Sequence, residues 1–335
     1  MGKITIKMIA QAAQTSPTTV SRYLSRQGYV SDVTRDRIEE AIEALGYAPK
    51  KQNFISTDST KKIVMVVSAD VSGQVYIDYF QGMSDYLSDK GYVCLQAYSD
   101  RDAQKECKYL KYAEENQFGA VIMLNATETP ELVAQLQKMT RPVVFVNRHL
   151  RSADVDAITV DNYRGGYVAT RYLLDAGHRN IVHLSGMNYS VITQDRMMGF
   201  RDAMLDAGVS LTDEHIFRGD MTEKSGEKLA AEIARHPGRF TAAFVANDYM
   251  AIGLLNGLHK RGIRVPEDFS IINFDSTPLA KNARVRLTSV GFDSVEMGRA
   301  AGEVVYQKMH AQTDLPRKVI YPAAINEGDS VTKCR

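Results

Sequence analysis

From residue 63 to residue 275 the chain alternates short apolar runs with amphipathic segments. The first half of this stretch contains IVMVVS, YVCLQAY, AVIML and PVVFVN, and the second half contains IVHLSG, AAFVAN and FSIINFD. Short β-rich apolar runs separated by helical periodicity are typical of parallel strands that are buried on both faces. Because this rhythm occurs twice, we expect an α/β core of two doubly wound parallel-sheet lobes.

Polar side chains follow the ends of these runs. Arg148 comes just after PVVFVN, Asn247 follows AAFVA, and Asp275 ends FSIINFD. Ligands of doubly wound sheets bind at the carboxyl ends of the strands, so we expect these groups to face a cleft between the lobes. Amides, carboxylates and guanidinium groups can each bond two neighbouring hydroxyls. Asp and Asn after strands also cap helices, and capping is the favoured interpretation for Asp248.

Arg196 and two aromatic residues complete the candidate ligand site. Arg196 opens a helix predicted from about residue 196 to 207, after IVHLSG and its loop. The chain has no Trp, so the aromatic walls of a site would come from Tyr or Phe. The candidate ligand contacts are Tyr76, Arg148, Arg196, Asn247, Phe274 and Asp275.

Residues 5–24 predict two short helices around a tight turn, the spacing of a helix-turn-helix. Ser16 can cap the second helix, and Pro17 follows where a missing N–H costs nothing. Ser31 can cap a third amphipathic helix. The apolar residues of the three helices recur at three- and four-residue intervals and predict a miniature core of Ile6, Ile9, Ala10, Ala13, Val20, Leu24, Ile38, Ala41, Ile42 and Leu45.

The polar side of the second helix carries residue types that contact bases and phosphates. Residues 1–28 contain four basic residues and no acidic residue, although the whole chain has a net charge of only +1. A helical hairpin from any globular domain is the alternative interpretation, and the local positive charge favours DNA binding over it. The candidate DNA contacts are Thr5, Ser16, Pro17, Thr18, Thr19, Ser21, Arg22 and Ile55.

Between the head and the core, residues 50–61 are polar, charged and rich in Ser and Thr, so they predict a hinge or linker. Only Phe54 and Ile55 interrupt this character. The pair could contact the large domain or insert into the DNA minor groove, and the sequence favours neither.

Composition limits the remaining possibilities. Three cysteines without metal-ligand spacing fit a reducing cytoplasm, and no apolar run is long enough for a membrane helix or a signal peptide. His178 and His183 are five residues apart and most simply flank a strand, so neither a metal nor another cofactor is expected. Glycine-rich nucleotide loops and a Ser/His/Asp set are absent, which argues against an enzyme.

Taken together, these motifs resemble the lactose/galactose-repressor family of bacterial transcription regulators over about residues 4–322. The motifs that carry the resemblance are TVSR, VSDVTRDRI, VNR, VDN with YLLDAGHRNIVHLSG, RMMGF, VANDYMAIG and VPEDFSIINFD. The resemblance implies a homodimer whose heads bind double-stranded DNA at a palindromic operator, and a periplasmic-binding-protein-like core that responds to a small molecule. It also implies that Pro17, Thr18 and Arg22 lie on base edges and that Arg196 and Asp275 contact the effector.

The resemblance further implies a threaded domain organisation. The head would span residues 1–49, the hinge 50–61, and the core 62–322, with a polar tail at 323–335. Within the core, one lobe would comprise about 62–161 and 291–320, and the other about 162–290.

Three departures from the family pattern stand out. Gln14 replaces the usual turn glycine, at a cost of about 1 kcal/mol for a left-handed residue, and Met8 replaces a common acidic residue. The hinge segment QNFISTDS lacks the family's minor-groove leucine, for which Ile55 or Phe54 is the candidate substitute. The segment after Pro322 contains no leucine heptad, which favours a dimer over a tetramer.

These observations predict a cytoplasmic, sequence-specific repressor whose operator affinity is controlled by a sugar or sugar phosphate. A purine or nucleoside is the rival effector. An α/β enzyme carrying a DNA module is a weaker alternative. A purely architectural DNA protein is weaker still, because it leaves a large two-lobed core unexplained.

Overall fold

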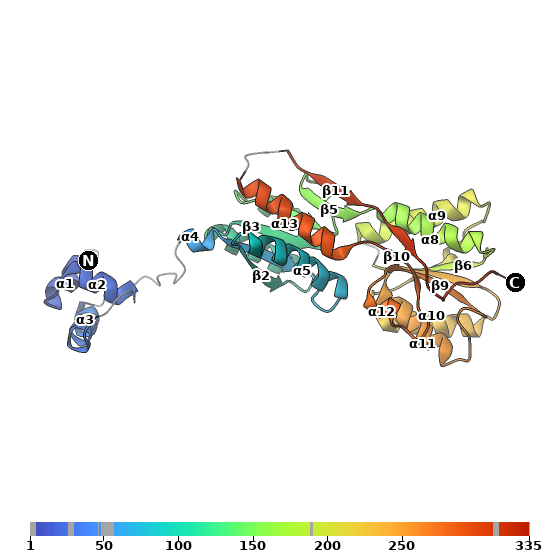
Figure 1. Cartoon of the computed structure of the whole chain (residues 1–335), viewed down its shortest axis with the longest axis horizontal. Coiled ribbons are helices and arrows are strands. Elements are labelled where there is room, and N and C mark those ends of the chain that lie inside the picture. Colours follow the sequence, from blue (N-terminus) through green and yellow to red (C-terminus); the bar gives the residue numbers. More distant parts are fainter. Residues whose placement is uncertain are drawn as a thin grey trace. The chain divides into compact units, whose positions relative to one another are not determined.

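The computed structural model describes residues 5–25, 30–45, 47, 57–187, 190–310 and 315–334. The chain forms two compact units, Met1–Thr60 and Lys61–Arg335 (Figure 1). Phe54, Ile55 and most of the predicted hinge lie outside the described residues.

The first unit is a helical head. It contains α1 (Ile6–Ala12), α2 (Pro17–Ser25), α3 (Asp32–Leu45) and the short helix α4 (Thr57–Thr60). Gln14 occupies the turn after α1 with a φ of +48°, which confirms the predicted left-handed residue. Ser16 caps α2, because its Oγ accepts the N–H of Thr19 at 3.0 Å. The turn and cap therefore separate two helices in the expected register.

The head has its own apolar core. Ile9, Val20 and Ile38, one from each of the three longer helices, are fully buried together. The prediction that Ile6 joins this core is wrong, since its side chain is 38% exposed at the start of α1. Tyr23 instead packs against the core from α2, and its hydroxyl donates to Glu39 Oε1 at 2.5 Å.

The second unit begins with a lobe built on a fully parallel six-stranded sheet, which we call the N-lobe. Its strand order is β11-β5-β4-β3-β1-β2. The strands are β1 (Ile63–Ser68), β2 (Val93–Tyr98), β3 (Ala120–Leu124), β4 (Val143–Val146), β5 (Asp156–Val160) and β11 (Lys318–Tyr321). The helices are α5 (Gln74–Asp89), α6 (Ala103–Glu115), α7 (Pro130–Leu136) and α13 (Ser294–His310).

Helices cover both faces of this sheet, because consecutive apolar residues such as those of IVMVVS point to both faces of a strand. Val64 and Val66 of β1 pack toward α5 and α13, whereas Ile63, Met65 and Val67 pack toward α6 and α7. All six residues of β1 are buried in consequence.

The other lobe, the C-lobe, also contains a six-stranded sheet, with the order β12-β10-β9-β8-β6-β7 and only β12 antiparallel. Its strands are β6 (Ile181–Ser185), β7 (Ile216–Arg218), β8 (Ala242–Val245), β9 (Ser270–Asp275), β10 (Thr288–Gly291) and β12 (Ala324–Asn326). Its helices are α8 (Asn162–Asp175), α9 (Val191–Asp206), the 3₁₀ helix η1 (Asp213–His215), α10 (Glu223–Arg235), α11 (Asp248–His259) and α12 (Pro278–Lys281).

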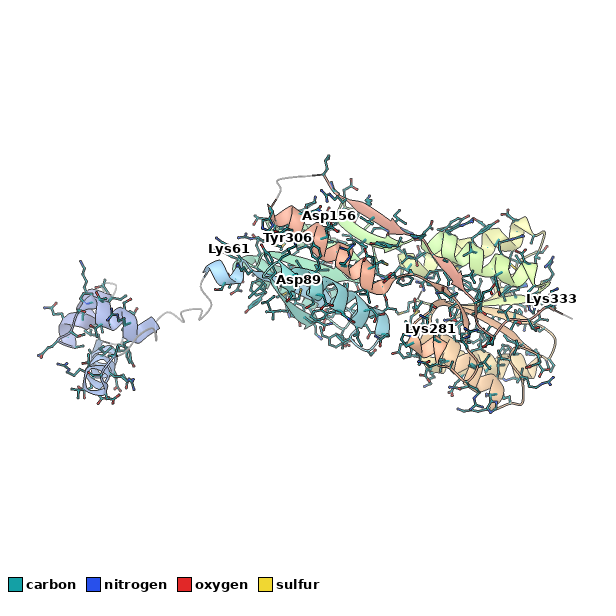
Figure 2. All side chains as sticks on the ribbon, in the orientation of Figure 1. Lys61, Asp89, Asp156, Lys281, Tyr306 and Lys333 are labelled. Carbon is teal, nitrogen blue, oxygen red and sulfur yellow. The ribbon has the colours of Figure 1, made fainter. Side chains whose placement is uncertain are left out.

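The chain passes between the lobes after β5, after β10 and after β11. At the N-lobe edge, Asp156 holds β11 beside β5: it accepts the N–H of Arg317 at 2.8 Å and pairs with Lys308 at 3.1 Å (Figure 2). Because only these three connections cross between the lobes in the described chain, they can act as the hinge about which the lobes move.

The segment at 323–335 is not the separate polar tail that the sequence predicts. It forms β12, which pairs with β10, and then runs along the C-lobe (Figure 2 labels Lys333). Ser330 is fully buried and donates to the carbonyl of Ile271 at 2.6 Å, and the N–H of Cys334 donates to the carbonyl of Ala176. The sequence pattern did not predict this strand, because hydrogen bonds of the backbone and of hydroxyl groups, rather than buried apolar side chains, hold the segment in place.

Candidate functional site

Four of the predicted DNA contacts of the head are exposed on α2. Pro17, Thr18, Ser21 and Arg22 are exposed on α2, and Thr5 is exposed at the N-cap of α1. Ser16 and Thr19 bond to each other through their hydroxyls at 2.8 Å, so these two side chains also stabilise the start of α2. Small polar groups and one guanidinium thus lie on the exposed side of α2, outside the head's apolar core.

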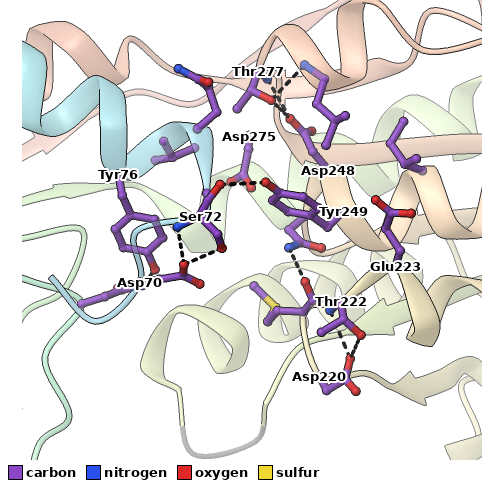
Figure 3. A pocket seen from close by; sticks show the side chains of 18 of the residues that line it. Asp70, Ser72, Tyr76, Asp220, Thr222, Glu223, Asp248, Tyr249, Asp275 and Thr277 are labelled. Atoms are coloured by element: carbon purple, nitrogen blue, oxygen red, sulfur yellow. Dashed lines mark hydrogen bonds between the residues drawn. The ribbon is translucent and has the colours of Figure 1, made fainter. Parts of the chain in front are cut away.

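A cavity of about 1120 Å³ lies between the two lobes of the core. Loops at the carboxyl ends of parallel strands supply most of its wall, as expected for this architecture. Residues from both lobes line it, including Asp70, Tyr76, Asn125, Asn147 and Arg148 from the N-lobe and Arg196, Asp220, Asn247, Tyr249 and Asp275 from the C-lobe (Figure 3).

Three cavity residues at strand ends have left-handed backbones. Asn125 has a φ of +58°, Asn147 of +61° and Asp275 of +100°. Such conformations cost about 1–3 kcal/mol for side chains other than glycine, and they persist where surrounding structure enforces them. Here they turn the chain sharply after β3, β4 and β9, so that an amide or carboxylate faces the cavity.

Arg196 is 3% exposed and lies in the second turn of α9. The prediction that it opens the helix is wrong, because α9 begins at Val191. Its Nε donates to Asn162 Oδ1 at 2.9 Å, its Nη1 donates to the carbonyl of Ala246, and its Nη2 lies 3.7 Å from Asp275 Oδ1. The guanidinium thus has a fixed orientation in the cavity wall.

The prediction that Phe274 contacts the ligand is wrong. The ring is fully buried, does not line the cavity, and packs under the guanidinium of Arg196, whose Cζ is 3.4 Å from the ring centroid. Side chains alternate along a strand, so Asp275 and Phe274 point to opposite faces of β9. Phe274 therefore supports Arg196 by a cation–π contact from the core side.

Two carboxylates lie close to each other at the C-lobe wall. Burial raises the pKa of Asp248 to about 7, and the nearby charge of Asp275 adds to this increase. Asp248 accepts hydrogen bonds from the Nδ2 of Asn273 and from the N–H of Thr277, the latter at 2.8 Å. Burial also raises the pKa of Asp275, while Arg196 opposes that increase. Asp248 is thus a structural anchor, and Asp275 remains at the cavity surface.

The sequence favours Asp248 as a helix cap, and this prediction is wrong. Asn247, rather than Asp248, caps α11, because its Oδ1 accepts the N–H of Met250 at 3.0 Å. The Nδ2 of Asn247 donates to the carbonyl of Met221 at 3.1 Å. Asn247 lines the cavity, but both ends of its amide are engaged within the protein.

On the N-lobe side, three polar groups form a relay. The Nδ2 of Asn147 is 3.4 Å from Asn125 Oδ1, and the Nδ2 of Asn125 donates to the hydroxyl of Tyr76 at 2.6 Å. The relay links Tyr76 of α5 to the ends of β3 and β4. It leaves Asn147 Oδ1 buried with no hydrogen-bond partner among the described residues.

Hydrogen bonds join the lobes across the cavity. The Tyr249 hydroxyl donates to the carbonyl of Ser72 at 2.9 Å (Figure 3), and Arg148 Nη2 is 3.3 Å from Ser190 Oγ. Sequence reasoning missed Tyr249, because nothing in a helix sequence shows which residue reaches another lobe. It also missed Asn125, although this residue follows a strand as Asn147 does and the same rule could have found it.

Two kinds of feature are absent from the described residues. Among the described residues, no group of three or more His, Cys, Asp or Glu side chains is placed to hold a metal ion. Within the same residues, no helix has the length and apolar character needed to cross a membrane.

Comparison with known proteins gives two family matches. Residues 5–50 match the model of bacterial regulatory proteins of the lacI family, and residues 170–331 match the periplasmic binding protein-like domain. The chain is 30% identical to the HTH-type transcriptional repressor PurR of Vibrio vulnificus, over 91% of this chain and 92% of that one. It is 30% identical to catabolite control protein A of Priestia megaterium, over 92% and 94%. It also resembles the solved complex of the transcriptional regulator CelR with cellobiose, with a TM-score of 0.74, 26% identity, and coverage of 98% and 100%.

A helix-turn-helix head joined to a two-lobed, periplasmic-binding-protein-like core defines a DNA-binding transcription regulator. The protein is a regulator and not an enzyme. The chain belongs to the lacI family of bacterial regulatory proteins.

Proposed function

We propose that this regulator is a cytoplasmic repressor of carbohydrate-utilisation genes whose operator affinity depends on a small sugar bound between the lobes. The observation that carries the proposal is the cavity itself, where Asn147 and Tyr76 of one lobe face Arg196 and Asp275 of the other. Side chains of these types bind vicinal hydroxyls, and a ligand that bridges both lobes biases their relative position. The relative solved with cellobiose supports the same class of ligand.

The proposed mechanism is a population shift between lobe arrangements. A sugar that binds one arrangement more tightly changes the fraction of protein able to hold operator DNA. A hundredfold change in operator affinity needs a coupling free energy of only about 2.7 kcal/mol. Tyr249 and Arg148 each make one hydrogen bond between the lobes, and a single hydrogen bond contributes only about 0.5–1.5 kcal/mol. A coupling free energy of this size is therefore enough to shift the equilibrium between lobe arrangements.

On the DNA side, the proposed contacts are Thr5 and the exposed face of α2, with Arg22 as the residue that reads a base edge. A single head of this size holds DNA weakly, and a palindromic operator presents two half-sites. We therefore assign the repressor a homodimeric state, in which two heads bind one operator.

The edge strand β2 supports the homodimer. It leaves one side of the N-lobe sheet without a neighbouring strand among the described residues, and Val93, Leu95 and Tyr98 are 56%, 45% and 44% exposed on it. Apolar residues on an open sheet edge are usually covered by another chain. Sedimentation at micromolar protein tests this directly: a dimer that Leu95→Glu converts to a monomer supports it, and a monomeric wild-type protein contradicts it.

A purine effector is the second candidate, because one relative is named PurR. A purine needs a flat slot between aromatic or apolar faces, and apolar and aromatic side chains such as Tyr76, Ile192 and Tyr249 also line this cavity. The oxygen acceptors of Asn147 and Asp275, which suit sugar hydroxyls, favour the sugar.

Thermal unfolding against a panel of sugars, sugar phosphates, nucleosides and purines tests the proposed effector. A ligand at a hundred times its Kd stabilises the protein by about 2.7 kcal/mol. The proposal expects one sugar to raise the melting temperature of wild-type protein but not of Asp275→Ala. A shift with a purine alone would replace the sugar by the second candidate.

A further inference from the structure

Three guanidinium groups of the cavity wall already have protein partners. Arg101 Nη2 is 2.8 Å from Asp70 Oδ2. Arg148 Nη1 donates to the carbonyl of Ala126 at 2.5 Å, in addition to its contact with Ser190. The three nitrogens of Arg196 face the partners given above, including Asp275. An anionic ligand would therefore compete with protein partners for each of these cations.

The rest of the described cavity wall adds one further cation, at the exposed rim. Among the described residues that line the cavity there is no Lys and no His, and the remaining basic residue, Arg284, is exposed. Five carboxylates and four guanidinium groups line the cavity: Asp70, Asp220, Glu223, Asp248, Asp275, Arg101, Arg148, Arg196 and Arg284. Hydrogen bonds from Ser225 and Thr222 lower the pKa of Asp220 to about 2, so this carboxylate is charged at neutral pH.

The hydrogen-bonding capacity left open is mainly that of acceptors. Asn147 Oδ1 is buried without a partner among the described residues, while its Nδ2 lies 3.4 Å from Asn125 Oδ1. The carboxylate of Asp275 lines the cavity, and Arg196 Nη2 lies 3.7 Å from its Oδ1. An unpaired buried acceptor costs about 1–3 kcal/mol, so the bound ligand must bring donors to this position.

We infer that the effector is an uncharged polyhydroxyl compound, and that the cavity rejects phosphorylated and acidic sugars. The inference deepens the proposed sugar-responsive function and rests on it. Sugar hydroxyls donate to Asn147 Oδ1 and Asp275 and accept from Tyr76. A phosphate dianion offers only acceptors, and deep in this cavity it would lose its hydration beside guanidinium groups that already have protein partners.

Titration calorimetry with matched ligand pairs tests the inference. The probes are glucose, galactose, fructose, ribose and cellobiose, each measured beside its phosphate ester, and gluconate and glucuronate beside glucose. The inference expects a neutral member to bind and its phosphate or acid to bind at least about a hundredfold more weakly. A phosphate or acid that binds as tightly as its neutral partner overturns the inference and leaves the sugar effector in place. If no sugar of either kind binds, the proposed sugar effector fails and the inference fails with it.

A second experiment uses the sugar that binds most tightly. Inorganic phosphate at constant ionic strength should leave its affinity unchanged, whereas displacement by phosphate contradicts the inference. Asn147→Ala should weaken binding about tenfold, because the hydroxyl loses its acceptor. The matched control is Asn282→Ala at the exposed rim of the same cavity, with an effect below about twofold. Equal losses in the two variants contradict the role of Asn147 Oδ1.

Discussion

The contact between α8 and α9 predicts a large effect for one added methyl group, Gly166→Ala. A Cβ at Gly166 would lie 2.2 Å from the carbonyl oxygen of Arg196 and 2.9 Å from its carbonyl carbon. Ordinary contact begins at 3.4 Å, so the Arg196 backbone must move by about 1.2 Å (3.4 − 2.2). Because the obstacle is backbone, no side-chain rotation can relieve it.

The cost follows from two opposing effects. Overpacking of this kind costs about 3 kcal/mol at the upper end of its usual range. Replacing a helical glycine by alanine returns about 1 kcal/mol. The net loss of about 2 kcal/mol lowers the melting temperature by about 4–8 °C for a domain of this size. The same displacement moves the Arg196 guanidinium relative to Asp275, so sugar affinity should fall as well.

Differential scanning calorimetry of Gly166→Ala measures this loss. The matched control is Leu205→Ala on the facing helix α9, where the residue is 72% exposed and the cost should stay within about 0.5 kcal/mol. An unchanged or raised melting temperature in Gly166→Ala would refute the argument, because the two helices would then not be in the close contact described.

Three further outcomes are expected. Arg22→Ala should cost about 1–3 kcal/mol of binding free energy on the preferred operator and relax base preference. Lys7→Ala should weaken binding to specific and random DNA alike. If Arg22→Ala weakens binding to the operator and to random DNA equally, Arg22 does not read a base. Tyr249→Phe removes the hydrogen bond across the cavity, so stopped-flow release of the sugar should be about 2–10-fold faster, and an unchanged rate would remove its assigned role. Burial lowers the pKa of His183 to about 4 and raises that of Asp248 to about 7. As pH rises from 4 to 7, the contribution of His183 to the free energy of unfolding increases, because the unfolded chain holds the histidine proton to higher pH. The contribution of Asp248 decreases, because the folded protein holds the carboxyl proton to higher pH. His183→Phe should make the melting temperature fall more steeply with pH, and an unchanged slope would count against this balance.

Much of the fold could be predicted because its signals are local. The run IVMVVS predicts a strand buried on both faces, and all six residues of β1 are buried. Ser16 and Pro17 mark the start of α2 through capping chemistry that involves only the next turn. Strand-end residues such as Arg148 and Asp275 could be assigned to the cavity because parallel strands share one carboxyl edge.

The failures concern interactions that the local sequence does not encode. Phe274 was assigned to the cavity by its neighbours, but strand alternation places its ring in the core beneath Arg196. Tyr249 acts across the lobes, through a partner 177 residues away in sequence. The segment after Pro322 looked like a tail because it is polar, yet β10 offers it an open edge to pair with.

The central claim is that sugar binding and operator binding are coupled in one molecule. The most direct test is to select a palindromic operator from random DNA and to measure its affinity for the full chain at constant salt, with and without the sugar that stabilises the protein. We predict a change of tenfold or more, absent in Asp275→Ala, while DNA affinity without sugar stays the same in both proteins. An operator affinity that is unchanged at saturating sugar would contradict the account.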